Sequence, residues 1–193
     1  MLEKALVHHC APTLMGIKAA NLFAYPNQSE HALFFEIGML NARLQKKGIL
    51  LLPLRKEDGW ALIYLCRPRR LCTELMDPLA QRLLCRRGYC GTSLSALLPT
   101  LSDRLSQNAA FPHEIGLFLS YPPKDVECFI EREGRGYLCV GAWKVYGSAE
   151  RAKRTFLAYE AARRLCEKRF FEGVELENIA VSDEQLDKRD SIC

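Results

Sequence analysis

The sequence predicts an α+β protein in which helices cover a small, mostly apolar, mixed sheet of about four strands. Several segments carry apolar residues at the three- and four-residue spacing of amphipathic helices. Others are short apolar runs bounded by turn residues, which is typical of strands covered on both faces. Because two of these runs are joined by a short polar turn as a hairpin, the sheet is not expected to be purely parallel.

The N-terminal part of the chain is expected to form two helices and three strands. Apolar residues at helical spacing follow an Asn27–Glu30 capping box and precede a glycine stop at Gly48, namely Leu33, Ile37, Leu40 and Leu44. The other elements expected here are a helix over residues 2–9 that Cys10–Thr13 ends, a strand over 17–25, and a hairpin of 49–54 with 60–66.

The rest of the chain is expected to be mainly helical, with one strand from Tyr137 to Tyr146. Prolines set several boundaries, because a proline suits the first helical position and disrupts a helix interior. We expect helices over 70–86 with a second piece from Pro78, over 94–105 with a kink or break at Pro99, from Pro112, from Pro123, and from Ser148 to about Phe171. Residues 1–175 are interpreted as a single globular domain, and residues 176–193 as a polar, flexible C-terminal tail.

Composition predicts a soluble, cytoplasmic protein. The 193 residues are 49% hydrophobic and 26% charged, the balance of an ordinary globular domain. No run of apolar residues is long enough to cross a membrane, and the N-terminus lacks the basic start and apolar stretch of a secretory signal. The nine cysteines are an odd, scattered set, which favours reduced thiols. Cys193 is the last residue, so it does not fit a C-terminal prenylation box.

The net charge of +4 is low for a domain that binds nucleic acid nonspecifically. Nucleic-acid binding would need separate arginine groups to form one stripe, namely Arg67, Arg69, Arg70, Arg86 and Arg87. We therefore rank this class last. Neither the oligomeric state nor a cofactor can be derived from the sequence.

The chain contains no phosphate-binding glycine loop, no Cys-x-x-Cys pair, no His-Glu-x-x-His and no Gly-x-Ser-x-Gly motif. The first candidate site is therefore a local one, at His113 and Glu114 in the first turn of the helix expected from Pro112. A helix N-terminus favours an anion, and a histidine there can act as general acid or base. In the alternative interpretation, both residues cap the helix and pack against Tyr121.

Three cations are further candidates for binding a ligand. Lys144 and Lys18 are placed on apolar strands, where a buried ammonium must be paired or must serve a ligand. The alternative is that each lies near a strand end and extends to water. Arg67 follows the second hairpin strand, where its planar fork can hold a carboxylate or phosphate, unless it forms a solvated basic corner.

Cys10 is the third catalytic candidate, because Lys18 nearby would lower the pKa of a thiol. His8, His9 and Cys10 also form a row of metal-ligand types. Adjacent residues at a helix end point in different directions, however, so no metal site is predicted. A packed thiol at a turn is the alternative interpretation of Cys10.

Three segments together resemble a known family, namely Cys10–Leu14 with Lys18, Phe111–Val126, and Cys139–Tyr146. The chain is similar, from about Leu2 to Phe171, to an uncharacterised bacterial family of anaerobic Gram-positive bacteria, domain of unknown function 3793. The resemblance implies a bacterial cytosolic protein and carries no known fold, activity or site residue. Ala142 stands where a bulkier residue or a cysteine is expected.

These observations leave several functions open. The leading hypothesis is a site for a small anionic metabolite or cofactor lined by Lys18, Arg67, His113 and Lys144, with catalysis left open. The alternatives are an interaction or regulatory protein without catalysis, and a thiol- or metal-handling protein that uses Cys10 with His8 or His9. The leading hypothesis requires cations from separate segments to converge in space.

Overall fold

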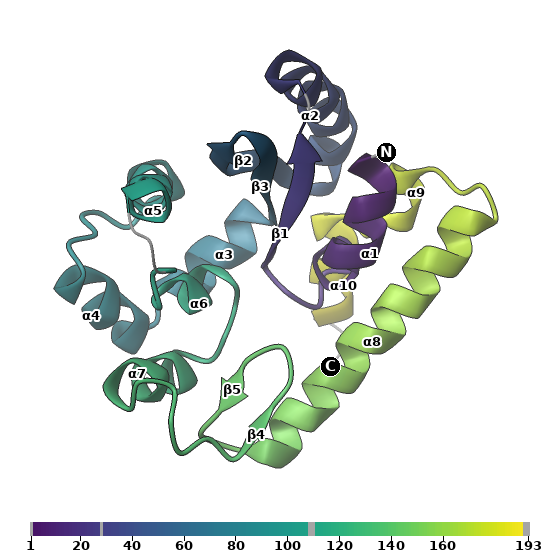
Figure 1. Cartoon of the computed structure of the whole chain (residues 1–193). Coiled ribbons are helices and arrows are strands. Elements are labelled where there is room, and N and C mark those ends of the chain that lie inside the picture. Colours follow the sequence, from purple (N-terminus) through teal and green to yellow (C-terminus); the bar gives the residue numbers. More distant parts are fainter. Residues whose placement is uncertain (1, 28, 108–110, 191–193) are drawn as a thin grey trace. The chain divides into compact units, whose positions relative to one another are not determined.

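A computed structural model describes residues 2–27, 29–107 and 111–190 (Figure 1). Cys193 therefore lies outside the described residues. The chain forms two compact units, which we describe separately: unit 1 comprises residues 1–69 and 159–193, and unit 2 comprises residues 70–158. The α+β class is confirmed, with the strands divided between two small sheets. No helix in the described part of the chain is long and apolar enough to cross a membrane.

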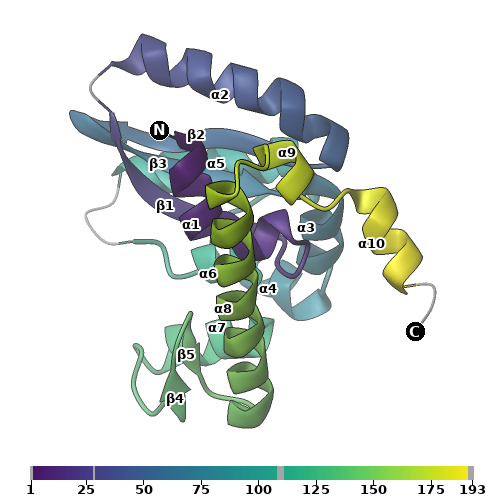
Figure 2. The same cartoon turned by 90° about the vertical axis from the view of Figure 1, so that its right-hand side faces the viewer.

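Unit 1 is built around a three-stranded sheet in the order β1-β3-β2, with both pairings antiparallel. Its elements are α1 (Leu2–Leu14), β1 (Ala20–Asn27), α2 (Glu30–Leu44), the 3-10 helix η1 (Gln45–Lys47), β2 (Leu50–Glu57), β3 (Gly59–Cys66), the part of α8 (Ala149–Phe171) from Tyr159 on, α9 (Leu176–Ile179) and α10 (Asp183–Asp190). The expected hairpin is β2 and β3, and Figure 2 shows α2 running along this sheet. The core contains the buried faces of α1, α2 and the sheet, closed by Cys166, Leu176 and Ile179.

The side chain of Asn41 on α2 covers the edge of β2. Its amide nitrogen donates to the carbonyl of Leu51 over 2.7 Å, and its oxygen accepts from the Leu51 N–H over 2.8 Å. Asn41 thus makes both hydrogen bonds that a neighbouring strand would make. An edge strand with free backbone groups invites pairing with another chain, and this contact fixes α2 to β2 while it blocks that edge position.

Local boundaries in unit 1 differ from the prediction at three places. Helix α1 continues through Pro12 to Leu14, because its last turn is buried and the carbonyl that Pro12 leaves without a donor belongs to the exposed His8. Strand β1 begins at Ala20, so Lys18 precedes the strand. The N-cap of α2 is Ser29, whose hydroxyl accepts from the Ala32 N–H, whereas Asn27 belongs to β1.

The guanidinium of Arg67, which follows β3, is completely buried and donates from all three of its nitrogens. It bonds the carbonyls of Thr13 and Leu14 at the end of α1, over 2.7 and 2.9 Å. Three further bonds reach the carbonyls of Lys47 and Val181 and the carboxylate of Asp183. The five N–H groups of an arginine are thereby all used within unit 1, so we assign Arg67 a structural role.

The segment after residue 175, expected to be a polar tail, carries α9 and α10. Leu176 and Ile179 are buried in the core of unit 1, and the Val181 N–H donates to the Leu14 carbonyl over 3.0 Å. Asp183, at the start of α10, lies against Gly48, where an added Cβ would meet its carboxylate at 2.0 Å. Gly48 also has a φ of 74°, so glycine is required there both for the turn and for space.

A second charged cluster holds the same C-terminal segment through Arg43 on α2. Arg43 bonds Glu3 at 2.5 Å and Glu175 at 3.0 Å, and its Nε donates to Glu177 at 3.0 Å. The hydrogen bond from Arg43 lowers the pKa of Glu177 below its ordinary value. Glu3 lies on α1, Glu177 lies on α9 and Glu175 precedes α9, so the cluster connects three helices of unit 1.

Unit 2 is mainly helical. Its elements are the larger part of α3 (Pro68–Leu75), α4 (Pro78–Arg86), α5 (Leu94–Gln107), α6 (Ile115–Phe118), α7 (Pro123–Glu131), β4 (Cys139–Val140), β5 (Lys144–Val145) and the first part of α8 (Ala149–Phe171). The helix starts expected at Pro78 and Pro123 are confirmed. Helix α5 continues through Pro99, whose missing hydrogen bond frees a carbonyl on the exposed Ser95, where water can bind it.

Two predictions in unit 2 were wrong. The helix expected from Pro112 begins only at Ile115, so His113 and Glu114 lie in the turn before α6. The strand expected over 137–146 is a short hairpin of β4 and β5. The chain turns at Gly141, where an added Cβ would meet the Phe156 ring at 2.3 Å. Glycine there allows α8 to pack its aromatic side chain directly against the turn.

We expect Arg67→Met to lower the free energy of unfolding by about 3–5 kcal/mol, because it leaves Asp183 and four carbonyls without their buried donor. Arg67→Lys keeps the positive charge but has fewer N–H donors, and we expect it to lower the free energy of unfolding by less than Arg67→Met does. The measurement is urea unfolding of each variant. Arg70→Met is the matched control, since Arg70 is exposed and pairs with Glu74 one turn away. Equal stability of Arg67→Met and Arg70→Met would contradict the structural role.

We expect the stabilisation from Arg43 to depend on pH. Because the pKa of Glu177 is depressed in the folded state, the pair stabilises the fold above the ordinary glutamate pKa, about 4.3, and loses its effect as the pH falls further. Arg43→Met should therefore destabilise by about 1–2 kcal/mol at pH 7 and by much less near pH 3. Urea unfolding at both pH values tests this. Lys168→Met, at an exposed 3.9 Å pair with Glu172, should cost little at either pH.

Candidate functional site

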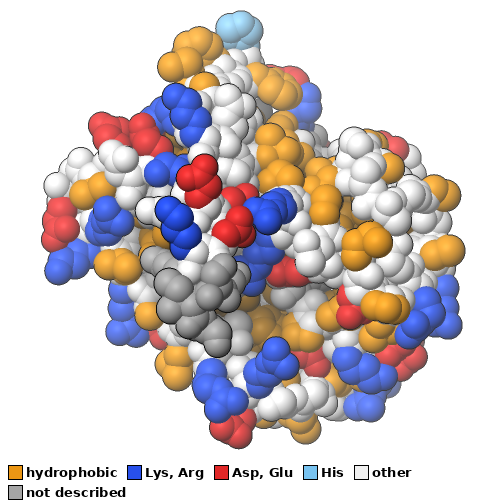
Figure 3. All heavy atoms as spheres, turned by 180° about the vertical axis from the view of Figure 1, so that it is seen from behind, with side chains coloured by type: hydrophobic (Ala, Val, Ile, Leu, Met, Phe, Trp, Pro, Cys, Tyr) orange, Lys and Arg blue, Asp and Glu red, His pale blue; other side chains and the backbone are white. Residues whose placement is uncertain are grey.

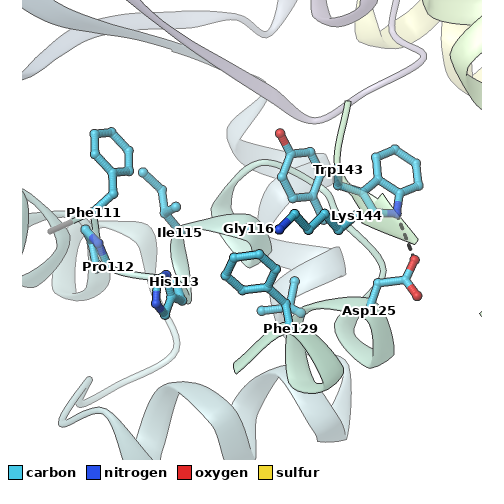
Figure 4. A pocket seen from close by; sticks show the side chains of 11 residues that line it. Phe111, Pro112, His113, Ile115, Gly116, Asp125, Phe129, Trp143 and Lys144 are labelled. Atoms are coloured by element: carbon cyan, nitrogen blue, oxygen red, sulfur yellow. Dashed lines mark hydrogen bonds between the residues drawn. The ribbon is translucent and has the colours of Figure 1, made fainter. Parts of the chain in front are cut away.

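Unit 2 contains a cavity of about 180 Å³ between α6, α7 and β5, which we call the His113–Lys144 pocket (Figure 4). Most of its walls are apolar or aromatic side chains. It is lined by Phe111, Pro112, His113, Ile115, Gly116, Tyr121, Asp125, Val126, Phe129, Trp143 and Lys144. Two of the residues predicted to bind a ligand, His113 and Lys144, thus line one cavity, although they are 31 residues apart in the sequence.

Lys144 extends from β5 into this pocket. In Figure 4 its amine end points toward the side on which His113 and Ile115 lie. The ammonium donates to the Gly134 carbonyl over 2.9 Å and lies over the rings of Phe129 and Tyr137, 5.6 and 5.0 Å from their centroids. Ring faces attract a cation. Among the described residues, no carboxylate forms an ion pair with Lys144, so its positive charge is balanced only by these weaker contacts.

His113 lies on the side of the Phe129 ring that faces away from Lys144 in Figure 4, and its side chain is exposed. Its ring meets the Phe129 ring edge to face, with 5.0 Å between centroids. This contact orients the imidazole on the wall of the pocket. Since His113 lies in a turn and α6 has only four residues, the expected anion site at a helix N-terminus is not formed. Its availability to a ligand comes instead from its place on the pocket wall.

Asp125 in the first turn of α7 fixes the far side of the pocket. One carboxylate oxygen accepts the N–H groups of Tyr146 and Gly147, each over 2.9 Å. The other oxygen accepts the indole N–H of Trp143 over 2.8 Å. Three donors therefore compensate a carboxylate that is only 5% exposed. The result is that the indole, and with it the turn before Lys144, is held in place.

Gly116 brings Tyr121 close to α6. An added Cβ at Gly116 would meet Val126 at 2.8 Å and the Tyr121 ring at 3.0 Å, so only glycine fits. The Tyr121 ring in turn stacks at a tilt on Trp143, with 5.3 Å between centroids. Burial raises the pKa of Tyr121, which keeps its phenol neutral. These contacts make the aromatic wall of the pocket rigid.

Glu114, a catalytic candidate, is 1% exposed and does not line the pocket. One of its oxygens accepts from Arg104 over 2.6 Å and from the hydroxyl of Tyr89 over 3.2 Å. Burial raises the pKa of Tyr89, and the negative charge of Glu114 adds to this shift. Glu114 therefore connects α5 with the turn before α6, which positions its neighbour His113 but leaves no carboxylate for catalysis.

The remaining candidates belong to unit 1. Lys18 is 4% exposed in the segment before β1, and its ammonium lies 5.6 Å from the centroid of the Tyr159 ring. Arg67 is the buried structural residue described above. Cys10 is completely buried, and burial raises the pKa of its thiol more strongly than Lys18 lowers it. A neutral, inaccessible thiol is a poor nucleophile, so the packed-thiol interpretation fits Cys10 better.

His8 and His9 also have partners within unit 1. The His8 Nδ1 lies 2.6 Å from a carboxylate oxygen of Glu167, and His9 stacks on Phe23 with 4.9 Å between centroids. Burial lowers the pKa of His9. Within the described ranges, no three histidine, cysteine, aspartate or glutamate side chains are grouped so that they could hold a metal ion.

Sequence reasoning missed the aromatic wall and the role of Asp125. The sequence offered one signal for Asp125, which is its position in the first turn after Pro123. Aspartate is common at the start of a helix. That position does not reveal that its acceptors hold Trp143, Tyr146 and Gly147 from another segment. The position of Phe129 on its helix also gives no signal, since helical spacing cannot distinguish a core residue from a pocket residue.

No curated protein and no solved structure matches the chain. A family model described as protein of unknown function (DUF3793) matches residues 6–180, which include α1 from Leu6 on, the three-stranded sheet of unit 1 and the whole of unit 2. The match confirms the resemblance carried by the segments around Cys10, His113 and Lys144. On this evidence the chain belongs to the DUF3793 family.

Proposed function

We propose that unit 2 binds a small anionic ligand with an apolar body in the His113–Lys144 pocket. The observation that carries the proposal is the ammonium of Lys144, which points into a largely apolar cavity without a carboxylate partner among the described residues. An ammonium has three N–H donors, and only one is used by Gly134. The other two N–H groups are available to an anionic oxygen.

The electrostatics of the pocket favour an anion over a cation. Asp125 also lines it, but its charge is compensated by three N–H donors from the chain. Lys144 is compensated only by one carbonyl and two ring faces. The groups that the pocket leaves for a ligand are therefore the N–H donors of Lys144 rather than the oxygens of Asp125. His113 on the pocket wall adds a donor for a second oxygen of the same ligand.

The predicted ligand contacts are tested with two simple carboxylates, hexanoate and benzoate, and with their neutral amides. Trp143 is one of the two tryptophans of the chain, so in a Trp60→Phe background its fluorescence reports on the pocket. We expect saturable changes with both carboxylates. Lys144→Met should weaken their binding about tenfold to a hundredfold, the worth of a hydrogen bond to a charged group. The amides should bind the parent protein as weakly as the carboxylates bind Lys144→Met.

Lys124→Met is the matched control for the loss of a positive charge. Lys124 is 68% exposed, pairs with Glu127 on the surface of α7 and does not line the pocket. Its replacement should leave carboxylate binding unchanged. The proposal fails if neither carboxylate binds, or if the Lys124 and Lys144 variants bind them equally well.

An interaction role is the second candidate, favoured by the outer face of α2. Phe34, Phe35 and Met39 are 44%, 67% and 56% exposed and lie outside the buried face of the helix. Figure 3 shows hydrophobic side chains on the surface of this helix, at the top of the view. Large exposed apolar residues grouped on one face are typical of interaction surfaces. The molecular mass in solution, measured for the parent and for Phe35→Ser, tests whether this face associates with a second copy.

A further inference from the structure

We infer that the apolar body of the ligand is a single aromatic ring, so that the pocket takes an aromatic monocarboxylate. This inference rests on the proposed function and narrows it. It follows from three properties of the His113–Lys144 pocket: its volume, the chemistry of its walls and the position of its one uncompensated charge. Each of them limits the ligand independently.

The volume limits the ligand to about one ring with a small substituent. The pocket measures about 180 Å³. An engineered apolar cavity of about 150 Å³ in another protein holds one benzene molecule. The additional space corresponds to a group of the size of a carboxylate. A nucleotide, a second fused ring system or a long acyl chain would have to extend outside the pocket.

The walls favour a flat aromatic body over a flexible chain. Rings line the pocket from several elements: Phe111 and His113 before α6, Tyr121 before α7, Phe129 on α7, and Trp143 before β5. Tyr121 and Trp143 are held against each other, and Trp143 also meets Phe156 edge to face at 4.7 Å. A rigid aromatic wall offers a bound ring edge-to-face or offset contacts beyond simple burial. An acyl chain would gain burial without these contacts.

The position of the charge limits the ligand to an acid group attached close to the ring. Lys144 Nζ lies 5.6 Å from the Phe129 centroid, on the face of the ring, and Figure 4 shows its amine end beside that ring. A ligand ring that packs against Phe129 therefore brings its first substituent to the ammonium. Lys144 is the one lysine among the described residues that line the pocket, so it matches one negative charge on the ligand.

The test compares benzoate with cyclohexanecarboxylate, which carries the same acid group on a saturated ring of slightly larger size. Burial alone would favour the saturated ring. We expect benzoate to bind about threefold to tenfold more tightly, which corresponds to one or two aromatic contacts. Titrations use Trp143 fluorescence in the Trp60→Phe background and are repeated by ligand-observed nuclear magnetic resonance.

Two variants isolate the ring contact. Phe129→Leu removes one ring from the pocket wall, the one against which the ligand ring is placed, and should lower the ratio of the two affinities towards one. Tyr137→Leu is the control, because Tyr137 also contacts Lys144 but does not line the pocket. It should change both affinities alike and leave their ratio unaltered. This ratio is insensitive to any common loss of affinity or of folded protein.

The outcomes separate the two proposals. If both acids bind with the same affinity and both depend on Lys144, the aromatic inference is overturned and the anion-binding function stands. If Phe129→Leu and the parent protein give the same ratio in favour of benzoate, the placement of the ligand ring against Phe129 is overturned, because the preference then arises elsewhere. If neither acid binds, the proposed function fails, and the aromatic inference fails with it.

Discussion

Unit 1 depends on one buried guanidinium. The end of α1, the end of η1 and the chain after α9 all direct backbone carbonyls to the same point, where water is excluded. A helix end leaves carbonyls without partners, and burying them unpaired would cost about 1–3 kcal/mol each. Arg67 supplies five N–H donors in a planar group, whereas a lysine would supply only three from a single nitrogen. Asp183 neutralises the charge, and Gly48 makes the space that Asp183 occupies.

Unit 2 contains the converse of the Arg67 cluster, a single carboxylate that accepts hydrogen bonds from several donors. Asp125 receives N–H groups from Trp143, Tyr146 and Gly147, so a carboxylate on α7 determines the path of the chain through β5. A hairpin with two residues in each strand is too short to be stable alone. Its geometry comes from Asp125 and from the packing of Phe156 on Gly141. The direction in which Lys144 points is a consequence of these contacts.

The sequence predicted those features of the fold that depend on the spacing of residues near one another in the chain. The class, the hairpin of β2 and β3, the buried face of α2 and the helix starts at Pro78 and Pro123 depend on residues within a few positions of one another. The sequence did not predict the features that depend on contacts between residues far apart in the chain. The roles of Arg67 and Glu114 depend on partners such as Val181 and Arg104, which sequence patterns do not reveal. His113 and Lys144 were identified individually, and only the fold places them in one pocket.

The charged candidates differ in how many of their hydrogen-bonding groups the chain itself satisfies, and this difference decides which of them is available to a ligand. Arg67 uses all five donors on its own chain, so its buried charge stabilises the fold. Asp125 accepts three donors and Glu114 accepts two from neighbouring segments. Lys144 uses one donor of three for the Gly134 carbonyl, in a cavity lined mainly by aromatic and apolar side chains. A partly buried ammonium with unused N–H groups forms stronger hydrogen bonds with an anionic ligand than an ammonium in water does. The reason is that fewer water molecules compete for its remaining N–H groups.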